Sequence, residues 1–326
     1  MVISTEKKFS IVANQQPERI NYLSRFIRRI CNFAPCLGIV NTPNRPPGIS
    51  VFMRVKDEAD WINLSIQSIR SIADEIVVVD NGSTDGTYDL LTDLSSKENG
   101  AMRLFRRPDL DLCALSNFAL SETRFQWVFR WDGDMVAHTT GKHSIFRLRN
   151  RLLSLDSRRY YVIYLRHINL SGDLSHQDPD EMVHIEEYLH TFSPGARYVH
   201  PGCFEAIKVP PYYRVLFWYE PYSFHMNVKP ARRVLLRYFW EDWLELRNYG
   251  EFPTLEDYVN EKIASEFGTT SWEEAESICI LRICQNHIRY DPEVFGPYPE
   301  LLKPYLQSPK YRLKFKDGRI IGREEN

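Results

Sequence analysis

The stretch that decides the fold is Ala73-Asp-Glu-Ile-Val-Val-Val-Asp-Asn-Gly-Ser-Thr-Asp-Gly-Thr87. Its continuous β-branched run at 75–79 is typical of a parallel strand that is buried on both faces. A glycine-containing loop follows at 80–86, and a segment with helical periodicity runs from 87 to 94. A strand that passes through a short loop into a helix is the repeating unit of a doubly wound α/β sheet.

Similar elements lie on both sides of this unit. Further strands are expected at 49–55, 102–105, 127–131 and 159–165, and further helices at 59–72 and 115–121. The sequence therefore predicts an α/β fold with a mostly parallel sheet flanked by helices.

The ends of the chain have a different character. We expect an N-terminal extension at 1–47, with an amphipathic helix over 20–33 and a proline-rich linker at 41–48. The main α/β domain should cover 48–245. Residues 246–326 should form a helical C-terminal extension and tail, with helices at 255–267 and 272–286.

The composition sets broad limits on function. The chain has 326 residues, of which 43% are hydrophobic and 26% charged, with a net charge of -2. These values are typical of a folded globular protein and give no electrostatic reason to expect nucleic acid as a partner. The six cysteines include no C-x-x-C pair, which argues against structural zinc and favours reduced thiols in the cytoplasm. No stretch reaches the roughly 18 apolar residues that a membrane span needs, so none is expected.

The helix expected at 20–33 is basic as well as amphipathic. Arg25, Arg28 and Arg29 surround its apolar face, and a second basic and apolar segment contains Arg232, Arg233 and Arg237. Two interpretations stay open. The N-terminal helix packs on the main domain, or these segments contact an anionic membrane peripherally, at its inner face.

Acidic clusters follow three of the expected strands. In an open parallel sheet, ligands bind at the carboxyl ends of the strands. Carboxylates that converge there repel one another unless a cation neutralises them. Asp132 and Asp134 follow the strand at 127–131 and can offer oxygen ligands to Mg²⁺ or Mn²⁺, which in turn accept a diphosphate.

Three blocks together resemble the family 2 glycosyltransferases with the GT-A fold, over about residues 48–140. They are Ile49-Ser-Val-Phe-Met-Arg-Val-Lys-Asp-Glu58, the stretch 73–87 quoted above, and Trp127-Val-Phe-Arg-Trp-Asp-Gly-Asp134. The resemblance implies an inverting transferase with a nucleoside-diphosphate sugar as donor, a divalent cation, and a glycan or glycolipid as acceptor. It also divides the main domain into a donor half at 48–140 and an acceptor half at 141–245.

The same resemblance assigns residues to the donor site. Arg54, Asp57 and Glu58 match the rim near the nucleobase. Asp80 and Asn81 match the pair that contacts base and ribose, where the family often has Asp-Asp, so the identity of the base stays open. Asn117 matches a helix residue beneath the donor, and Asp132 is assigned to the cation or to the ribose.

Inversion needs a general base that takes the proton of the acceptor hydroxyl. Two resemblances compete for it. Glu205 followed by His225 matches one pattern, in which His225 is the third metal ligand, and the pair Glu241-Asp242 matches another through Asp242. Glu220 is a further candidate, and Lys229 is assigned to the diphosphate.

Two other classes of function remain as alternatives. A nucleotidyltransferase acting on a sugar phosphate would also hold metal-bound phosphates, but it would favour a glycine-rich loop after the first strand, and 54–58 has no glycine. A non-catalytic module that binds nucleotide sugars or glycans would not need both Asp132 and Asp134.

Overall fold

The computed structural model describes residues 27, 30–40, 43–98, 100–200, 205–246 and 252–326. The chain divides into two compact units. The first comprises 1–168, 183–224 and 299–301, and the second comprises 169–182, 225–298 and 302–326. Each unit is described by itself.

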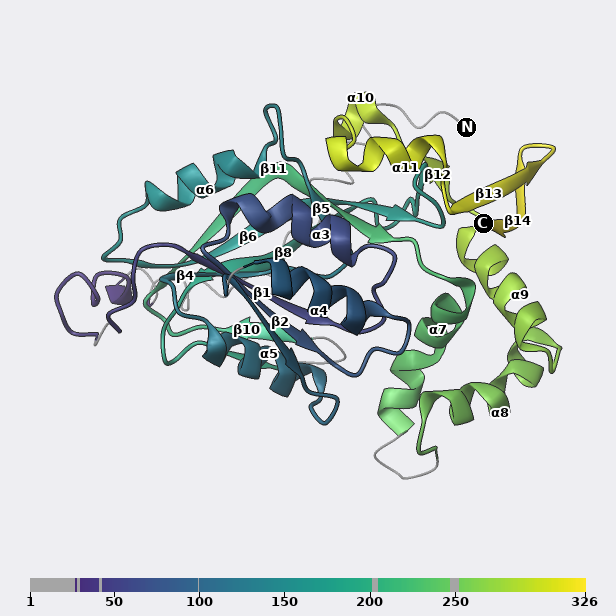
Figure 1. Cartoon of the computed structure of the whole chain (residues 1–326), viewed down its shortest axis with the longest axis horizontal. Helices are drawn as coiled ribbons and strands as arrows, with labels where there is room; N and C mark the ends of the chain where they lie inside the picture. Colours follow the sequence, from purple (N-terminus) through teal and green to yellow (C-terminus); the bar gives the residue numbers. More distant parts are fainter. Residues whose placement is uncertain (1–26, 28–29, 41–42, 99, 201–204, 247–251) are drawn as a thin grey trace. The chain divides into compact units, whose positions relative to one another are not determined.

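The first unit is built on an eight-stranded sheet with strand order β3-β2-β1-β4-β8-β6-β11-β5 (Figure 1). The strands are β1 (Ile49–Val55), β2 (Glu75–Asp80), β3 (Met102–Arg106), β4 (Trp127–Arg130), β5 (Met135–Ala137), β6 (Tyr160–Ser171), β8 (Val183–Thr191) and β11 (Tyr213–Asn227). Strands β6 and β11 continue along the chain into the second unit. A short pair, β9 (Arg197–Val199) with β10 (Ala206–Lys208), accompanies this sheet.

Helices cover both faces of this sheet. They are α3 (Ile62–Ile69) with the short 3-10 helix η1 (Arg70–Ile72), α4 (Thr87–Lys97), α5 (Leu112–Glu122) and α6 (Ile145–Leu153). One core joins alternate residues of β1, such as Val51 and Met53, to α3, α4 and α6. The other joins Phe52 and Val77 to α5. Because alternate residues of a strand face opposite sides, this division shows that the sheet is buried on both faces.

The predicted α/β class and its parallel half are confirmed. Strand β1 pairs in parallel with β2 and with β4, and β2 pairs in parallel with β3. Beyond β4 the direction changes, because β8 pairs antiparallel with both β4 and β6. This change decides which side chains reach the carboxyl end of β4.

The second unit has a helical core. Its elements are β7 (His176–Gln177), α7 (Ala231–Leu246), α8 (Leu255–Phe267), α9 (Trp272–Cys284), β12 (Ile288–Arg289), α10 (Pro292–Phe295), η3 (Glu300–Leu302), which begins in the first unit, α11 (Lys303–Gln307), β13 (Tyr311–Lys316) and β14 (Arg319–Glu325). Leu235 of α7, Val259 of α8 and Cys279 of α9 are fully buried in one cluster. The helices expected in the C-terminal extension are therefore present, and the charged tail forms the hairpin β13–β14.

The predicted domain boundaries stay predictions, and the second unit extends across the one expected at 245. Ile27, Ile30 and Cys31 are helical, as expected for 20–33, and the remainder of that prediction up to residue 29 lies outside the described residues. From Asn32 the chain turns, with the backbone N–H of Ile39 donating to the carbonyl of Ala34 over 3.1 Å. Among the described residues, no helix combines the length and the apolar character that a membrane span requires.

Candidate functional site

The carboxyl end of β2 is organised by Asp80, which is fully buried. Its carboxylate accepts hydrogen bonds from the backbone N–H of Gly82 at 2.9 Å and of Ser83 at 3.2 Å, and it lies 3.6 Å from Nε of Arg106. These contacts hold the turn that follows the strand. In this structure Asp80 therefore stabilises the 80–86 loop, which the sequence predicts to contact the nucleotide, by accepting backbone hydrogen bonds.

Two more aspartates tie that loop to the end of β1. The carboxylate of Asp57 accepts from the N–H of Thr84 at 2.7 Å, and Asp85 accepts from the N–H of Ala59 at 3.0 Å. Asp57 holds a left-handed backbone conformation with φ 55°, which Asp tolerates better than most residues do. The loops after β1 and β2 are therefore clamped together.

The two asparagines assigned to the donor site also bond to the backbone. The side-chain amide of Asn81 donates to the carbonyls of Arg107 at 2.9 Å and Leu110 at 3.0 Å. The amide of Asn117 donates to the carbonyl of Tyr198 at 2.9 Å and its oxygen accepts from the Tyr198 N–H at 2.8 Å, which anchors β9 to α5. Asn117 has a structural role here, and its contact with a donor stays a prediction.

The Asp132-Gly133-Asp134 turn follows β4 and is held by hydrogen bonds to Ser65 of α3. Ser65 donates to the carbonyl of Asp132 at 3.0 Å and accepts from the indole of Trp131 at 2.9 Å. A Cβ at Gly133 would lie 3.0 Å from Cγ of Glu58, so any larger residue would have to displace the Glu58 side chain by a few tenths of an ångström. Asp134 is buried, with 6% of its surface exposed.

An arginine of β1 connects the triplet to Glu205. Nη2 of Arg54 lies 3.2 Å from Oδ1 of Asp132, and Nη1 of Arg54 is ion-paired with Glu205. The other Glu205 oxygen accepts from the hydroxyl of Ser116 at 2.8 Å, and only 3% of the Glu205 side chain is exposed. Arg54 thus pairs both with Asp132 of the triplet and with the buried Glu205.

Arg130 at the end of β4 adds a second buried guanidinium. It pairs with Glu186 at 2.5 Å, lies 3.6 Å from Glu205, and stacks over the ring of Tyr188 at 4.5 Å. Burial alone would lower the pKa of Arg130, but the charges of Asp132 and Glu186 raise it well above its usual range. Two arginines therefore neutralise part of a cluster that contains Asp132, Glu186 and Glu205.

Arg130 and Glu186 are not among the residues expected at the site from the sequence. Arg130 stands within the block 127–134, where the pattern indicates only a strand. Glu186 and Glu187 lie in β8, whose antiparallel pairing with β4 brings its first residues to the carboxyl end of that strand. A Glu-Glu pair inside a strand-like run was the signal, but the pairing that gives it meaning is not readable from the sequence.

The other predicted residues lie elsewhere. Glu220 is exposed and pairs with Arg151 at 3.0 Å. Asp242 is exposed on α7 in the second unit, where Glu241 pairs with Arg237 at 3.2 Å. His225 and Lys229 also belong to the second unit; Nδ1 of His225 lies 3.0 Å from Oδ1 of Asn169, and Lys229 is buried. Their roles, and that of Asp242, stay predictions.

No group of three or more His, Cys, Asp or Glu side chains with metal-site geometry occurs among the described residues. The two carboxylates of the triplet still suit Mg²⁺ or Mn²⁺, because such ions are commonly held by one or two carboxylates together with substrate phosphates and water. The oxygen donors are of the correct type for a hard cation.

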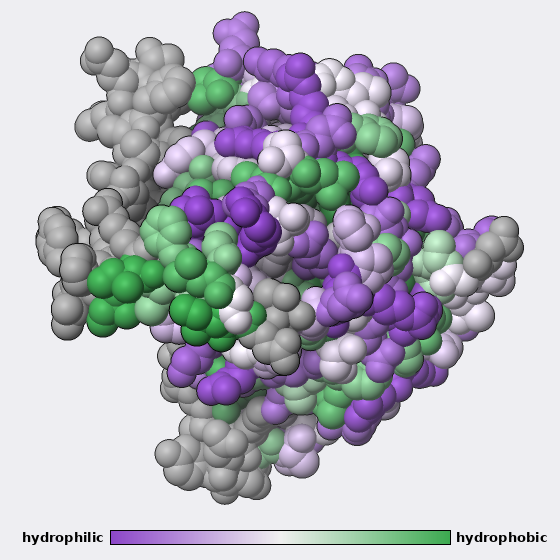
Figure 2. Space-filling view, turned by 90° about the vertical axis from the view of Figure 1, so that its left-hand side faces the viewer, coloured by the Kyte–Doolittle hydropathy of each residue, from purple (hydrophilic) through white to green (hydrophobic). Residues whose placement is uncertain are grey.

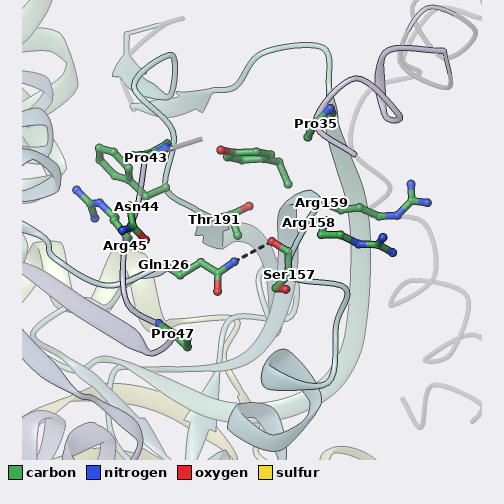
Figure 3. Close-up of a pocket in the computed structure, with 12 residues that line it drawn as sticks. Pro35, Pro43, Asn44, Arg45, Pro47, Gln126, Ser157, Arg158, Arg159 and Thr191 are labelled. Atoms are coloured by element: carbon green, nitrogen blue, oxygen red, sulfur yellow. Dashed lines mark hydrogen bonds between the residues drawn. The ribbon is translucent and has the colours of Figure 1, made fainter. Parts of the chain in front are cut away.

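A pocket of about 620 Å³ (Figure 3) lies at the amino ends of β1 and β4. Its lining includes Pro47 and Gln126, which precede β1 and β4, and Thr191, which ends β8. Since β1 and β4 are parallel, this pocket faces away from the triplet and is not the candidate donor site.

Comparison with known proteins finds similarity in the segment that contains the triplet. Residues 50–143 match the model of glycosyl transferase family 2. An uncharacterized glycosyltransferase of Rickettsia bellii is 34% identical over 86 residues, and one of Rickettsia felis is equally similar. The matched segment is 26% of this chain and 27% of the R. bellii protein, so the chain covers about a quarter of the length of that relative.

Solved structures of TarS from S. aureus are also similar. The TarS 1-349 complex with UDP-GlcNAc has 12% sequence identity and a TM-score of 0.40, covering 84% of this chain and 95% of that one. A longer TarS structure has a TM-score of 0.31 and 18% identity, covering 38% of this chain and 22% of that one. The resemblance expected for 48–140 is confirmed, because residues 50–143 match the model of glycosyl transferase family 2.

Proposed function

We propose that this protein is an inverting glycosyltransferase that moves a sugar from a nucleoside-diphosphate sugar to a hydroxyl of a glycan or glycolipid acceptor in surface polysaccharide assembly. The observation that carries the proposal is the position of the Asp132-Gly133-Asp134 turn at the end of β4, inside the matched segment 50–143 and next to Arg54. The cytoplasmic location expected from the sequence is part of the proposal.

We assign the cation to Asp132 and Asp134; the third ligand that the sequence resemblance suggests, His225, stays a prediction. Bound Mg²⁺ or Mn²⁺ would neutralise charge on the leaving diphosphate. Asp132 already pairs with Arg54, and 24% of the Asp132 side chain is exposed. We therefore assign Asp134 as the firmer metal ligand and Asp132 as the residue that changes partner when donor binds.

The basic side chains of Arg54 and Lys229 are assigned to the donor and not to the metal. The side chain of Arg54 is 11% exposed, with Nη2 lying 3.2 Å from Asp132 and Nη1 paired with Glu205. A guanidinium held in this way offers N–H donors to phosphate or ribose oxygens without a large cost of reordering. We assign Arg54 to donor binding and Lys229 to the diphosphate.

For the general base, Glu186 is added to the candidates from the sequence. It lies beside β4 and pairs with Arg130, yet 42% of its side chain is exposed, so an acceptor hydroxyl can reach it. Glu205 has 3% exposure and two arginine partners, which favour a positioning role. Asp242 remains the candidate on α7.

The proposal is tested by donor hydrolysis and transfer with a panel of nucleoside-diphosphate sugars. Turnover should require Mg²⁺ or Mn²⁺ and fall on the order of 10³-fold in Asp134→Ala with the fold retained, because charge on the leaving group is no longer neutralised. Asp109→Ala, an exposed aspartate paired with Arg107, is the control and should keep full activity. Pyrophosphate exchange in place of sugar transfer would replace this function by nucleotidyl transfer.

A further inference from the structure

An apolar patch stands out on the first unit, at the edge away from the triplet. It consists of Ile27, Ile30, Phe33, Leu37 and Ile39, whose exposed fractions run from 44% to 72%. Figure 2 shows hydrophobic surface gathered on this face, with strongly hydrophilic surface alongside it. Five large apolar side chains that face water within thirteen consecutive positions mark a surface that binds something.

The patch is attached to the sheet through an arginine-rich turn. The guanidinium of Arg159 lies over the ring of Phe33 at 4.9 Å, and the thiol of Cys36 donates to the carbonyl of Arg158 at 3.8 Å. Arg158 and Arg159 extend side by side at the rim of the pocket, as Figure 3 shows. Although Arg158 pairs with Asp156 at 3.0 Å, 74% of its side chain is exposed.

Acidic residues are sparse in the sequence around the patch, and Asp156 pairs with both Arg158 and Arg159. The sequence has no acidic residue between Glu18 and Asp57, and none between Asp134 and Asp156. The second of these intervals includes α6, whose basic residues are Arg147, Arg149 and Arg151, and whose C-terminal end exposes Leu153 by 45%. Apolar side chains bordered by Arg158 and Arg159, with Asp156 as the acid that pairs with both, fit a surface that is apolar inside and anionic at its face.

We propose that the apolar patch, with Arg158 and Arg159, docks the protein onto an anionic lipid bilayer. The apolar side chains enter the boundary between headgroups and acyl chains, while the two arginines stay at the level of the lipid phosphates. The patch lies where β1 and β4 begin and the triplet lies where they end. Docking therefore leaves the donor edge open, and it does not depend on catalysis.

The test is sedimentation of the full chain with vesicles of phosphatidylcholine alone or with about 30 mol% phosphatidylglycerol. The protein should bind the anionic vesicles, and Phe33→Glu/Leu37→Glu should lower the partition coefficient about tenfold or more, since both side chains leave the apolar layer. Arg158→Glu should lower it several-fold and reduce its salt dependence. The control is Phe315→Glu/Ile321→Glu, two side chains exposed by 50% and 52% on β13–β14, which should bind like the wild type.

Three results would overturn the docking proposal. They are failure of the wild type to bind anionic vesicles, equal binding by Phe33→Glu/Leu37→Glu, and a dimer in sedimentation velocity that this variant abolishes, which would make a second copy the occupant. Thermal unfolding of each variant confirms that the fold is retained. Nucleotide binding measured on the same samples keeps this outcome separate from the proposed transferase activity, which the variants should leave unchanged.

Discussion

Two groups of acidic residues at the carboxyl edge of the β1–β4 strands are held in opposite ways. The capped group, Asp57, Asp80 and Asp85, accepts hydrogen bonds from backbone N–H groups of neighbouring loops. The paired group, Asp132, Glu186 and Glu205, faces Arg54 and Arg130. The first group holds the loops, and we propose that the second group supplies charge for the transfer reaction, although both look alike in the sequence.

The largest expected difference concerns the base. Glu186→Gln should lower kcat of sugar transfer on the order of 10²- to 10³-fold with little change in KM, because the proton acceptor is lost while donor binding remains. Glu266→Gln is a matched control, since Glu266 is also paired with an arginine and 39% exposed.

The same assay orders the other candidates. Glu205→Gln should mainly raise KM for the donor, because it releases Arg54, and Asp242→Asn should have little effect. A loss of kcat in Glu205→Gln or Asp242→Asn that exceeds the loss in Glu186→Gln would return the base to the residues expected from the sequence.

The next effect concerns pH, since the paired group lies near a buried histidine. Burial lowers the pKa of His190 from 6.5 to about 4, and Arg130 contributes to the shift. The unfolded chain therefore takes up a proton below about pH 6.5 that the folded chain refuses until about pH 4, so stability falls as the pH falls through that interval. The loss for His190 should be on the order of 3 kcal/mol by pH 4.

Denaturant unfolding between pH 7 and pH 4 measures this loss. His190→Gln should flatten the dependence of the unfolding free energy on pH, whereas His200→Gln, at a side chain that is 39% exposed, should leave it as in the wild type. An unchanged slope in His190→Gln would remove the neutral histidine from this account.

The capped group should affect stability before chemistry. Asp80→Ala leaves the N–H groups of Gly82 and Ser83 without their acceptor inside the protein, which should cost about 2 kcal/mol of unfolding free energy. Asp109→Ala, at an aspartate whose side chain is 60% exposed, should cost far less. A catalytic defect in Asp80→Ala with full stability would instead place Asp80 among the residues that contact donor.

The smallest expected effect concerns Gly133, between Asp132 and Asp134. In Gly133→Ala the new Cβ would press on Glu58 and shift the triplet slightly, which should lower kcat/KM for the donor about tenfold. Gly195→Ala would also be crowded, with its Cβ 2.8 Å from Cγ of Pro210, but Gly195 lies away from the triplet, so the variant should lower stability and keep kcat/KM. Equal kinetic losses in both variants would show that crowding alone, and not the triplet, is responsible.

Much of the donor half could be predicted because its signals are local. The strand expected at 49–55 coincides with β1, and the strand and helix expected at 75–79 and 87–94 appear as β2 and α4. A β-branched run, a glycine turn and a strand end specify these elements within a few residues of sequence. The triplet at the end of β4 followed from the same logic.

The acceptor half could not be predicted in this way, because its site depends on pairing between distant strands. Nothing near Glu186 in the sequence indicates that β8 runs antiparallel beside β4. Likewise, no local signal shows that Glu205 meets Arg54, or that the carboxylate of Asp57 is used by Thr84. The sequence shows that these side chains are acidic. Only the tertiary contacts distinguish carboxylates that accept backbone hydrogen bonds from carboxylates that pair with arginines.

We propose above all that the Asp132-Gly133-Asp134 triplet binds a nucleoside diphosphate through a divalent cation. Isothermal titration calorimetry with a panel of nucleoside diphosphates, with and without Mn²⁺, tests it most directly. We predict that one diphosphate binds, that Mn²⁺ strengthens its binding about tenfold or more, and that Asp134→Ala removes the effect of the metal. Equal affinity with and without Mn²⁺ in the wild type, or an unchanged metal effect in Asp134→Ala, would contradict the account.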